Sequence, residues 1–373
     1  MSYGTGSGEL HEILEVASSA PAAWAARYPG RRFLGFFCSC WPEELVSALG
    51  GEPLRVLPPA RPGSPARLPA YCCTVARGCL ELGEKGTLGF LAGAGFAHAC
   101  DTMQCLGDIW RYAAGMPVFY LVPPVAPLAC GAEEYYTEEL SALYARLAGA
   151  WGEEPREDAL REAVKLHNRV RALVGRLEEL RAGLPSPLVA AVLRAGQVMP
   201  RREFLRLLEE ALPGLAARAS RPAGRRLLAV SGAVLETDDF YRLVEELGGR
   251  VVADDTCTGY RHYAAPVEES LPPLVALARR LASRPPCPCR HLGLEARARY
   301  LLQLVRSKGA HGLVLILRKY CEPHAWDAVH VAGALRGAGV PVLVLETEGP
   351  VVGEQERTRL QAFLEQLSGG SGP

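Results

Sequence analysis

Short apolar runs alternate with helical patterns over the first third of the chain. The runs predicted as strands cover residues 31–39, 52–59, 87–96 and 117–124. The helical patterns between them cover residues 42–50, 72–82 and 106–115. Pro42 suits the first turn of a helix and Gly50 suits its end. Because strands that alternate with helices are typical of a parallel sheet, we predict an α/β domain here.

The middle of the chain, from about residue 131 to residue 220, changes to a helical period. One predicted apolar face carries Leu160, Ala163, Val164, His167, Val170, Val174, Leu177 and Leu180. His167 lies on that face, so we predict a buried core histidine rather than a metal ligand. The charges on the opposite face indicate a solvated surface.

A second alternating segment follows the helical one. Its predicted strands cover residues 226–232, 250–255, 312–321 and 340–346. Its predicted helices cover residues 236–249, 295–308 and 325–339, with a last helix from about Glu354. We therefore predict an α/β fold of two parallel-sheet domains, at residues 1–130 (with a leading helix) and 223–373, joined by a helical segment at 131–222.

Composition adds limits to this picture. A chain of 373 residues suits two cores better than one. Lys plus Arg and Asp plus Glu number 41 each, which argues against nucleic acid or a membrane surface as a partner. The first residues are polar and no apolar run is long enough to span a bilayer. We therefore expect a cytoplasmic protein.

Twelve cysteines are unusual for such a chain, and in a reducing compartment they favour metal binding or catalysis over disulfides. Their spacing fits neither a zinc ribbon nor a ferredoxin. At the carboxyl ends of predicted strands lie Cys38, Cys100, Cys257 and Cys321, and Cys72 and Cys73 open a helix. Ligands of open α/β sheets collect at such ends, and helix N-termini favour thiolates. This pattern favours a shared metal or cluster site, with plain packing as the alternative.

Five stretches then carry a resemblance to a known family. They are GFFCSCWPEELVSALGGEPLRV, YCCTVAR with HACDTMQCLGDIWR, VVADDTCTGYRHY, GLVLILRKYCEPHAWD, and VPVLVLETEGPVVGEQERTRLQAFLEQL. In this order they make the chain similar to the 2-hydroxyacyl-CoA dehydratase and benzoyl-CoA reductase family of iron–sulfur proteins. The resemblance implies two flavodoxin-like domains that hold one [4Fe-4S] cluster.

The resemblance also implies the cluster's ligands. Matched motif by motif, they are Cys73, Cys100 and Cys321, with Cys72 as the alternative to Cys73. Cys105, one helical turn after Cys100, is not expected to be a ligand. Three thiolates leave one iron of a cubane open to substrate, as a catalytic zinc keeps one position open.

The implied activity is radical dehydration or reduction of an acyl-CoA thioester. Members of the family receive a low-potential electron from a separate ATP-dependent iron–sulfur activator, and they work as two related subunits or as a homodimer. The chain has no G-x4-GK[ST] loop of its own, which agrees with ATP being used by another protein.

Further residues each have two interpretations. Glu44 is either an acid/base group near the cluster or a helix cap, and His98 is either a hydrogen-bonding group at the site or a cap. Asp254, Asp255 and Arg261 are predicted to bind polar groups of the substrate, although Asp255 also suits a turn cap and Arg261 the surface.

Two rival functions stay open at this point. Some relatives are homodimers with two fused cubanes that reduce small molecules, and Cys79, Cys257, Cys287 and Cys289 would supply their extra ligands. A cysteine expected between the first two ligands is missing, which argues against this rival. The other rival is an accessory, non-catalytic subunit. Cys287 and Cys289 lie in a proline-rich break, so packing or a surface position is predicted for both.

Overall fold

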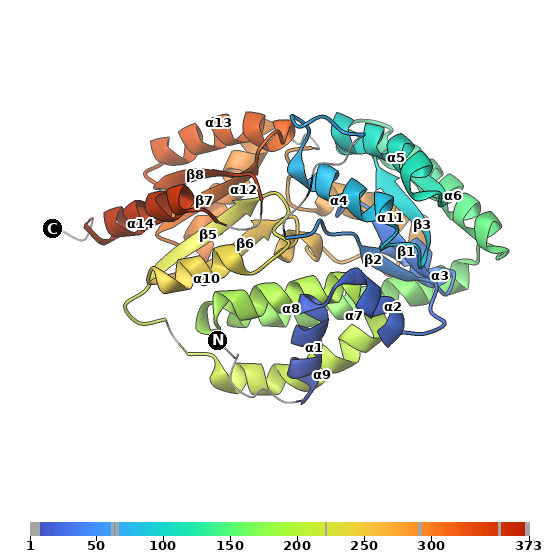
Figure 1. Cartoon of the computed structure of the whole chain (residues 1–373), viewed down its shortest axis with the longest axis horizontal. Coiled ribbons are helices and arrows are strands. Elements are labelled where there is room, and N and C mark those ends of the chain that lie inside the picture. The colour runs from blue at the N-terminus through green and yellow to red at the C-terminus, as the bar shows by residue number, and fades with distance from the viewer. Residues whose placement is uncertain are drawn as a thin grey trace.

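The computed structural model describes residues 8–60, 63, 67–220, 222–289, 293–349 and 352–369. Two four-stranded sheets, all of whose strand pairs are parallel, form its centre (Figure 1). The first sheet has the order β2-β1-β3-β4 and the second the order β6-β5-β7-β8. Each order matches the flavodoxin-like arrangement over four strands, and the predicted α/β class with two parallel sheets is confirmed.

The predicted strands are all present. The first sheet consists of β1 (Phe33–Phe36), β2 (Glu52–Arg55), β3 (Leu91–Ala97) and β4 (Val118–Leu121). The second consists of β5 (Arg226–Gly232), β6 (Gly249–Thr256), β7 (Gly312–Arg318) and β8 (Val342–Thr347). Most of their residues are buried because helices cover both faces, which explains why they read as continuous apolar runs.

The helices of the first half are α1 (Gly8–Ser18), α2 (Pro21–Arg27), α3 (Glu43–Ala48), α4 (Thr74–Glu84) and α5 (Asp101–Ala114). The predicted helical segment holds α6 (Ala132–Trp151), α7 (Glu157–Leu180), α8 (Ser186–Val198) and α9 (Arg201–Arg218). The second half holds α10 (Asp239–Glu246), α11 (Pro273–Ser283), α12 (Leu294–Ser307), α13 (Glu322–Gly337) and α14 (Glu354–Gly369). Two short 3-10 turns, η1 (Arg181–Gly183) and η2 (Tyr260–His262), complete the elements. The hydrophobic pattern did not predict α11.

The helical segment packs against both sheets. Helix α8 is buried along its whole length and contacts β2 of the first sheet and β6 of the second (Figure 1). Helix α7 packs on α3, and there His167 is buried, with its Nε2 2.9 Å from Ser47 Oγ. The prediction that His167 belongs to the core is confirmed. No helix in the described ranges is both long and apolar enough to cross a membrane.

Buried charges tie the first sheet to the helical segment. Glu43 Oε2 at the start of α3 lies 2.7 Å from Arg201 Nη2 of α9, and Glu43 Oε1 lies 2.8 Å from His262 Nε2 of η2. Glu44 pairs with Arg171 of α7, and both side chains are almost fully covered. Charges buried in pairs depend on their partners, so these elements stabilise one another.

Candidate metal centre

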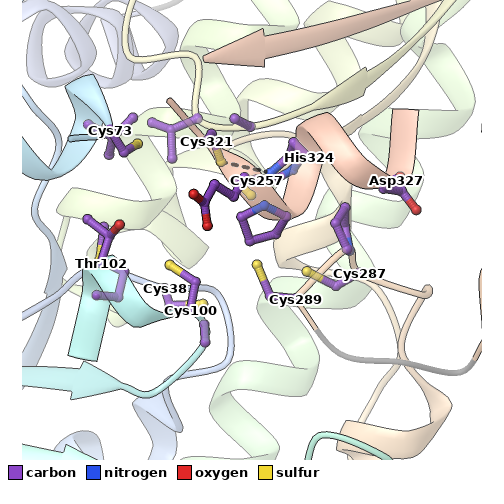
Figure 2. Close-up of a pocket in the computed structure, with 18 of the residues that line it drawn as sticks. Cys38, Cys73, Cys100, Thr102, Cys257, Cys287, Cys289, Cys321, His324 and Asp327 are labelled. Atoms are coloured by element: carbon purple, nitrogen blue, oxygen red, sulfur yellow. Dashed lines mark hydrogen bonds between the residues drawn. The ribbon is translucent and has the colours of Figure 1, made fainter. Parts of the chain in front are cut away.

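A cavity of about 400 Å³ lies at the carboxyl ends of strands from both sheets. Seven of the twelve cysteines line it, namely Cys38, Cys73, Cys100, Cys257, Cys287, Cys289 and Cys321 (Figure 2). All twelve lie within the described residues, and none forms a disulfide. Leu294, Tyr320 and Trp326 also line the cavity but are exposed, so they mark its opening.

Sheet topology explains this gathering of thiols. Strands β1 and β3 are neighbours at the point where the chain changes direction across the first sheet, and β5 and β7 are the equivalent pair in the second. A crevice forms at such a switch point because the connections on its two sides run in opposite directions. Cys38 follows β1, Cys100 follows β3 and Cys321 follows β7, so the crevices of both sheets contribute to one cavity.

The three predicted cluster ligands share a local structure. Cys73, Cys100 and Cys321 are each the residue immediately before a helix, namely α4, α5 and α13. The first turn of a helix has backbone N–H groups without helical partners and a positive end of the helix dipole. Three helices therefore direct their positive ends toward the cavity, which favours thiolates and other anions there.

Cys73 and Cys321 interact directly. The Cys321 thiol lowers the pKa of Cys73 to about 6, and the backbone amides of Ala76 and Val75 contribute to this effect. Cys73 in turn raises the pKa of Cys321. The hydrogen bond between the two thiols thus favours the charged form of Cys73.

The third predicted ligand is close to this pair. Burial raises the pKa of Cys100 to about 11, and the negative charge of Cys73 adds to the increase. Cys100 also contributes to the raised pKa of Cys321. All three thiols line the same cavity.

His324 adds a nitrogen to the cavity wall. Its Nδ1 lies 3.3 Å from Cys321 Sγ (Figure 2). Its side chain is buried, and Nε2 has no hydrogen-bond partner among the described residues. The His324 ring therefore packs beside Cys321 at the cavity wall.

Two buried arginines line the cavity together with the thiols. Arg55, 1% exposed, lines the cavity and donates to Ser39 Oγ at 2.8 Å and to the Cys257 carbonyl at 3.2 Å. Arg297 also lines the cavity and donates from Nε to Asp327 Oδ2 at 2.6 Å. A cavity with these cations and three helix N-termini suits a ligand of negative charge.

The spacing of the thiols bears on the kind of metal group that fits. Within the described residues, no three side chains of ligand type are grouped tightly enough to hold one metal ion. A tetrahedral ion with metal–sulfur bonds of about 2.3 Å holds its sulfurs about 3.8 Å apart. A cubane has an iron at each of its thiolate corners and separates its thiolates further. The thiol-rich lining and the positive surroundings of the cavity fit an iron–sulfur cluster, whose irons are held by cysteine thiolates.

The alternatives to these ligands are placed differently. Cys72 does not line the cavity, whereas its neighbour Cys73 does and is 8% exposed. Cys105 is exposed on α5. His98 lies outside the cavity wall, and its ring packs edge-on against Tyr120 with centroids 5.5 Å apart. The geometry thus separates Cys73 from Cys72 and does not bring His98 to the thiols.

Glu44 is not part of the cavity either. Its carboxylate is 1% exposed and contacts Arg171. Burial alone raises the pKa of Glu44, but Arg171, His167 and Arg280 outweigh it and lower the pKa to about 2. The structure thus gives Glu44 a buried ion pair, and it neither caps α3 with its side chain nor faces the thiols.

The predicted substrate-binding residues are occupied by internal contacts. Asp254 accepts from Tyr241 Oη at 2.7 Å and from Thr256 Oγ1 at 2.7 Å. Asp255 accepts from Ser231 Oγ at 2.7 Å, and Arg261 Nε lies 3.4 Å from its Oδ1. None of Asp254, Asp255 and Arg261 lines the cavity. Their contacts indicate a structural role under the cavity, because buried polar groups need partners.

Several cavity residues were missed by the sequence analysis. Cys287 and Cys289 line the cavity, although packing or a surface position was favoured for them over a loop that covers the site. Arg297 and Asp327 were not singled out at all, because an arginine and an aspartate at helical spacing resemble a solvated face. The only available signal was the cysteine pair around Pro288, which is rigid enough to present both thiols in one direction.

Comparison with known proteins agrees with this geometry. A family profile described as 2-hydroxyglutaryl-CoA dehydratase, D-component, matches residues 38–367. The chain is 23% identical to the (R)-phenyllactyl-CoA dehydratase beta subunit of Clostridium sporogenes and 26% identical to the lactoyl-CoA dehydratase beta subunit of Anaerotignum propionicum, each over 91% of this chain and 92% of the relative. It is 26% identical to a benzoyl-CoA reductase subunit of Thauera aromatica, over 84% of each chain. Because the profile covers nearly the whole chain, the protein belongs to the 2-hydroxyglutaryl-CoA dehydratase D-component family.

Proposed function

We propose that this chain is the iron–sulfur subunit of an enzyme that dehydrates or reduces an acyl-CoA thioester. It holds one [4Fe-4S] cluster through Cys73, Cys100 and Cys321, and its electron comes from an ATP-dependent iron–sulfur activator. The relatives are dehydratase beta subunits and a benzoyl-CoA reductase subunit, which supports a related second subunit as a further partner.

The observation that carries the proposal is the position of the three cysteines. They come from segments far apart in the chain, yet each caps a helix whose N-terminus faces the same cavity. Packing cysteines have no reason to share this position, whereas thiolate ligands gain from the N-terminal amides. The match of these residues to the family's motifs supports the same assignment.

The bound cluster would supply a low-potential electron and an open iron that acts as a Lewis acid. The residues of the chain prepare its surroundings. Arg55 and Arg297 offset negative charge at the cavity wall, and Asp327 holds the Arg297 guanidinium in place. His324 Nδ1 lies 3.3 Å from Cys321 Sγ, so it can hydrogen-bond this proposed ligand. The exposed side chains at the opening leave room for the coenzyme A portion to stay outside.

Iron and acid-labile sulfide, measured per chain on anaerobically purified protein, test the proposal. We expect about four of each, as one cubane requires. Cys100→Ala and Cys321→Ala should lose the iron and keep the fold by circular dichroism. Cys105→Ala, on the exposed side of α5, is the matched control and should keep the iron. Full iron in both ligand variants would refute the assignment.

The same measurement separates the rival functions. About eight irons per chain would indicate the relatives with two fused cubanes, which seven cavity cysteines could accommodate. A single cluster whose oxidation state does not respond to an activator would indicate an accessory subunit. Turnover of a 2-hydroxyacyl-CoA or an aromatic acyl-CoA in the presence of activator and partner would establish which thioester reaction the enzyme performs.

A further inference from the structure

More thiols face the cavity than one cubane with an open iron requires. Beyond the three proposed ligands, Cys38, Cys257, Cys287 and Cys289 line the same space. Cys287 and Cys289 differ from the other two because they lie on a loop between α11 and α12 rather than after a strand. In Figure 2 both lie across the cavity from Cys73.

Long-range contacts hold this loop against the cavity. Arg297 Nη1 of α12 donates to the Pro286 carbonyl at 2.6 Å, and the same guanidinium donates to Ser231 Oγ at 2.8 Å and to Asp327 at 2.6 Å. At the start of the loop, Arg284 donates to the Arg261 carbonyl at 3.0 Å. These contacts fix the part of the loop that precedes Cys287, and both thiols line the cavity.

The two thiols lie close to each other and to a proposed cluster ligand. A hydrogen bond joins the side chains of Cys287 and Cys289, and both line the cavity together with Cys100 (Figure 2). His324, whose Nδ1 lies 3.3 Å from the proposed ligand Cys321, borders the same cavity. A thiolate of the pair thus has access to the part of the cavity that the cluster would occupy.

We propose that one thiolate of the Cys287–Cys289 pair is a fourth, displaceable ligand that closes the open iron until substrate arrives; this inference rests on the proposed function. The exchange involves no change of oxidation state. The bond from iron to the cysteine sulfur breaks with its electron pair on sulfur, the lone pair of the incoming ligand takes the position, and the released thiolate accepts a proton from water. The resting cluster would then have no open position for small ligands or oxygen.

Cyanide serves as the probe, added to the anaerobic holoprotein with its cluster reduced, and the signal is the electron paramagnetic resonance spectrum. Wild type is compared with Cys287→Ser/Cys289→Ser and with Cys105→Ala, whose thiol is exposed. Apparent affinity falls in proportion to the fraction of open sites, so a position closed in about nine of ten molecules binds cyanide about tenfold more weakly. The double variant should therefore respond at a cyanide concentration at least about tenfold lower than wild type and the control.

Each outcome decides the proposal. Equal cyanide responses of wild type and double variant, with equal iron, would overturn it. Loss of iron from a double variant that is folded by circular dichroism would also overturn it, since the pair would then be an obligatory ligand. If the double variant fails to fold, Cys289→Ala and Cys287→Ala are tested separately. The inference is overturned if neither single variant responds at a lower cyanide concentration than wild type. Absence of a cluster from wild type would instead refute the proposed function, and iron analysis reveals that before cyanide is added.

Discussion

Glu44→Gln tests whether this carboxylate is structural, as its contacts indicate, or an acid/base group, as its sequence motif allowed. Glu44 is 1% exposed, and its partner Arg171 has a side chain that is 9% exposed. Glutamine keeps the size of the side chain but removes its charge. The Arg171 guanidinium is then buried without a counterion, which is the costly way to break an ion pair.

The magnitude follows from the pKa of Glu44. Burial acts to raise this pKa, but Arg171, His167 and Arg280 outweigh burial and lower the pKa from 4.5 to about 2. That difference corresponds to about 3 kcal/mol of stability at neutral pH, similar to the ~3–5 kcal/mol expected for a broken buried pair. Because the folded pKa is the lower one, this contribution is fully present above pH 4.5. It decreases as the pH falls toward about 2.

Urea unfolding of the metal-free protein at pH 7 and at pH 3 is the assay. We expect Glu44→Gln to lower the unfolding free energy by about 3 kcal/mol at pH 7 and by less at pH 3. The control is Glu157→Gln on α7, whose pair with Arg161 at 2.6 Å has side chains 66% and 40% exposed. It should cost less than about 0.5 kcal/mol. A loss below about 1 kcal/mol for Glu44→Gln at pH 7 would refute the reasoning.

Three further substitutions are informative. Gly95→Ala in β3 places a Cβ against the buried ring of Trp41, so we expect a loss of about 1–3 kcal/mol in urea unfolding. The Cβ that Gly149→Ala adds in α6 meets nothing within 4 Å, so this control should be neutral or stabilising by up to about 1 kcal/mol. Equal effects of Gly95→Ala and Gly149→Ala on the unfolding free energy would contradict the packing argument. Arg55→Met removes the buried donor to Ser39 Oγ and one of the two donors to the Cys257 carbonyl, so it should cost about 1–3 kcal/mol and speed alkylation of the cavity thiols. Unchanged alkylation rates would show that Arg55 does not order these thiols.

Strands were predictable here because each is a short, nearly fully buried parallel strand between turns. Helix α11 was not predicted, although one of its faces is apolar. Its sequence combines Pro272 and Pro273 with Arg279, Arg280 and Arg284, which suggests an exposed break. In the structure the prolines start the helix, and Arg280 donates to the carbonyls of Ala264 and Ala265. Those acceptors lie in a neighbouring loop, so the local pattern could not indicate them.

The candidate site also has a part that the sequence predicts and a part that it does not predict. Cys100 and Cys321 follow strands, so strand prediction and switch-point topology are enough to bring them together. Cys287 and Cys289 depend on the hydrogen bond from Arg297 to Pro286, a contact between side chain and loop that no periodicity encodes. For Asp255 the sequence leaves two interpretations open, for the opposite reason. Its residue type suggests substrate binding, but whether a buried carboxylate meets a ligand or a neighbouring arginine is decided only by the assembled fold.

The ion pairs of Glu43 and Glu44 have a consequence for biosynthesis. A nascent chain that ends after β4 contains both glutamates but not Arg171, Arg201 or His262. Folding at that stage would bury two carboxylates without cations, which is strongly unfavourable. We therefore expect the first sheet not to reach its final packing on the ribosome until η2 has emerged. Since Cys321 follows later still, the cluster that we propose would be assembled after these ion pairs have formed.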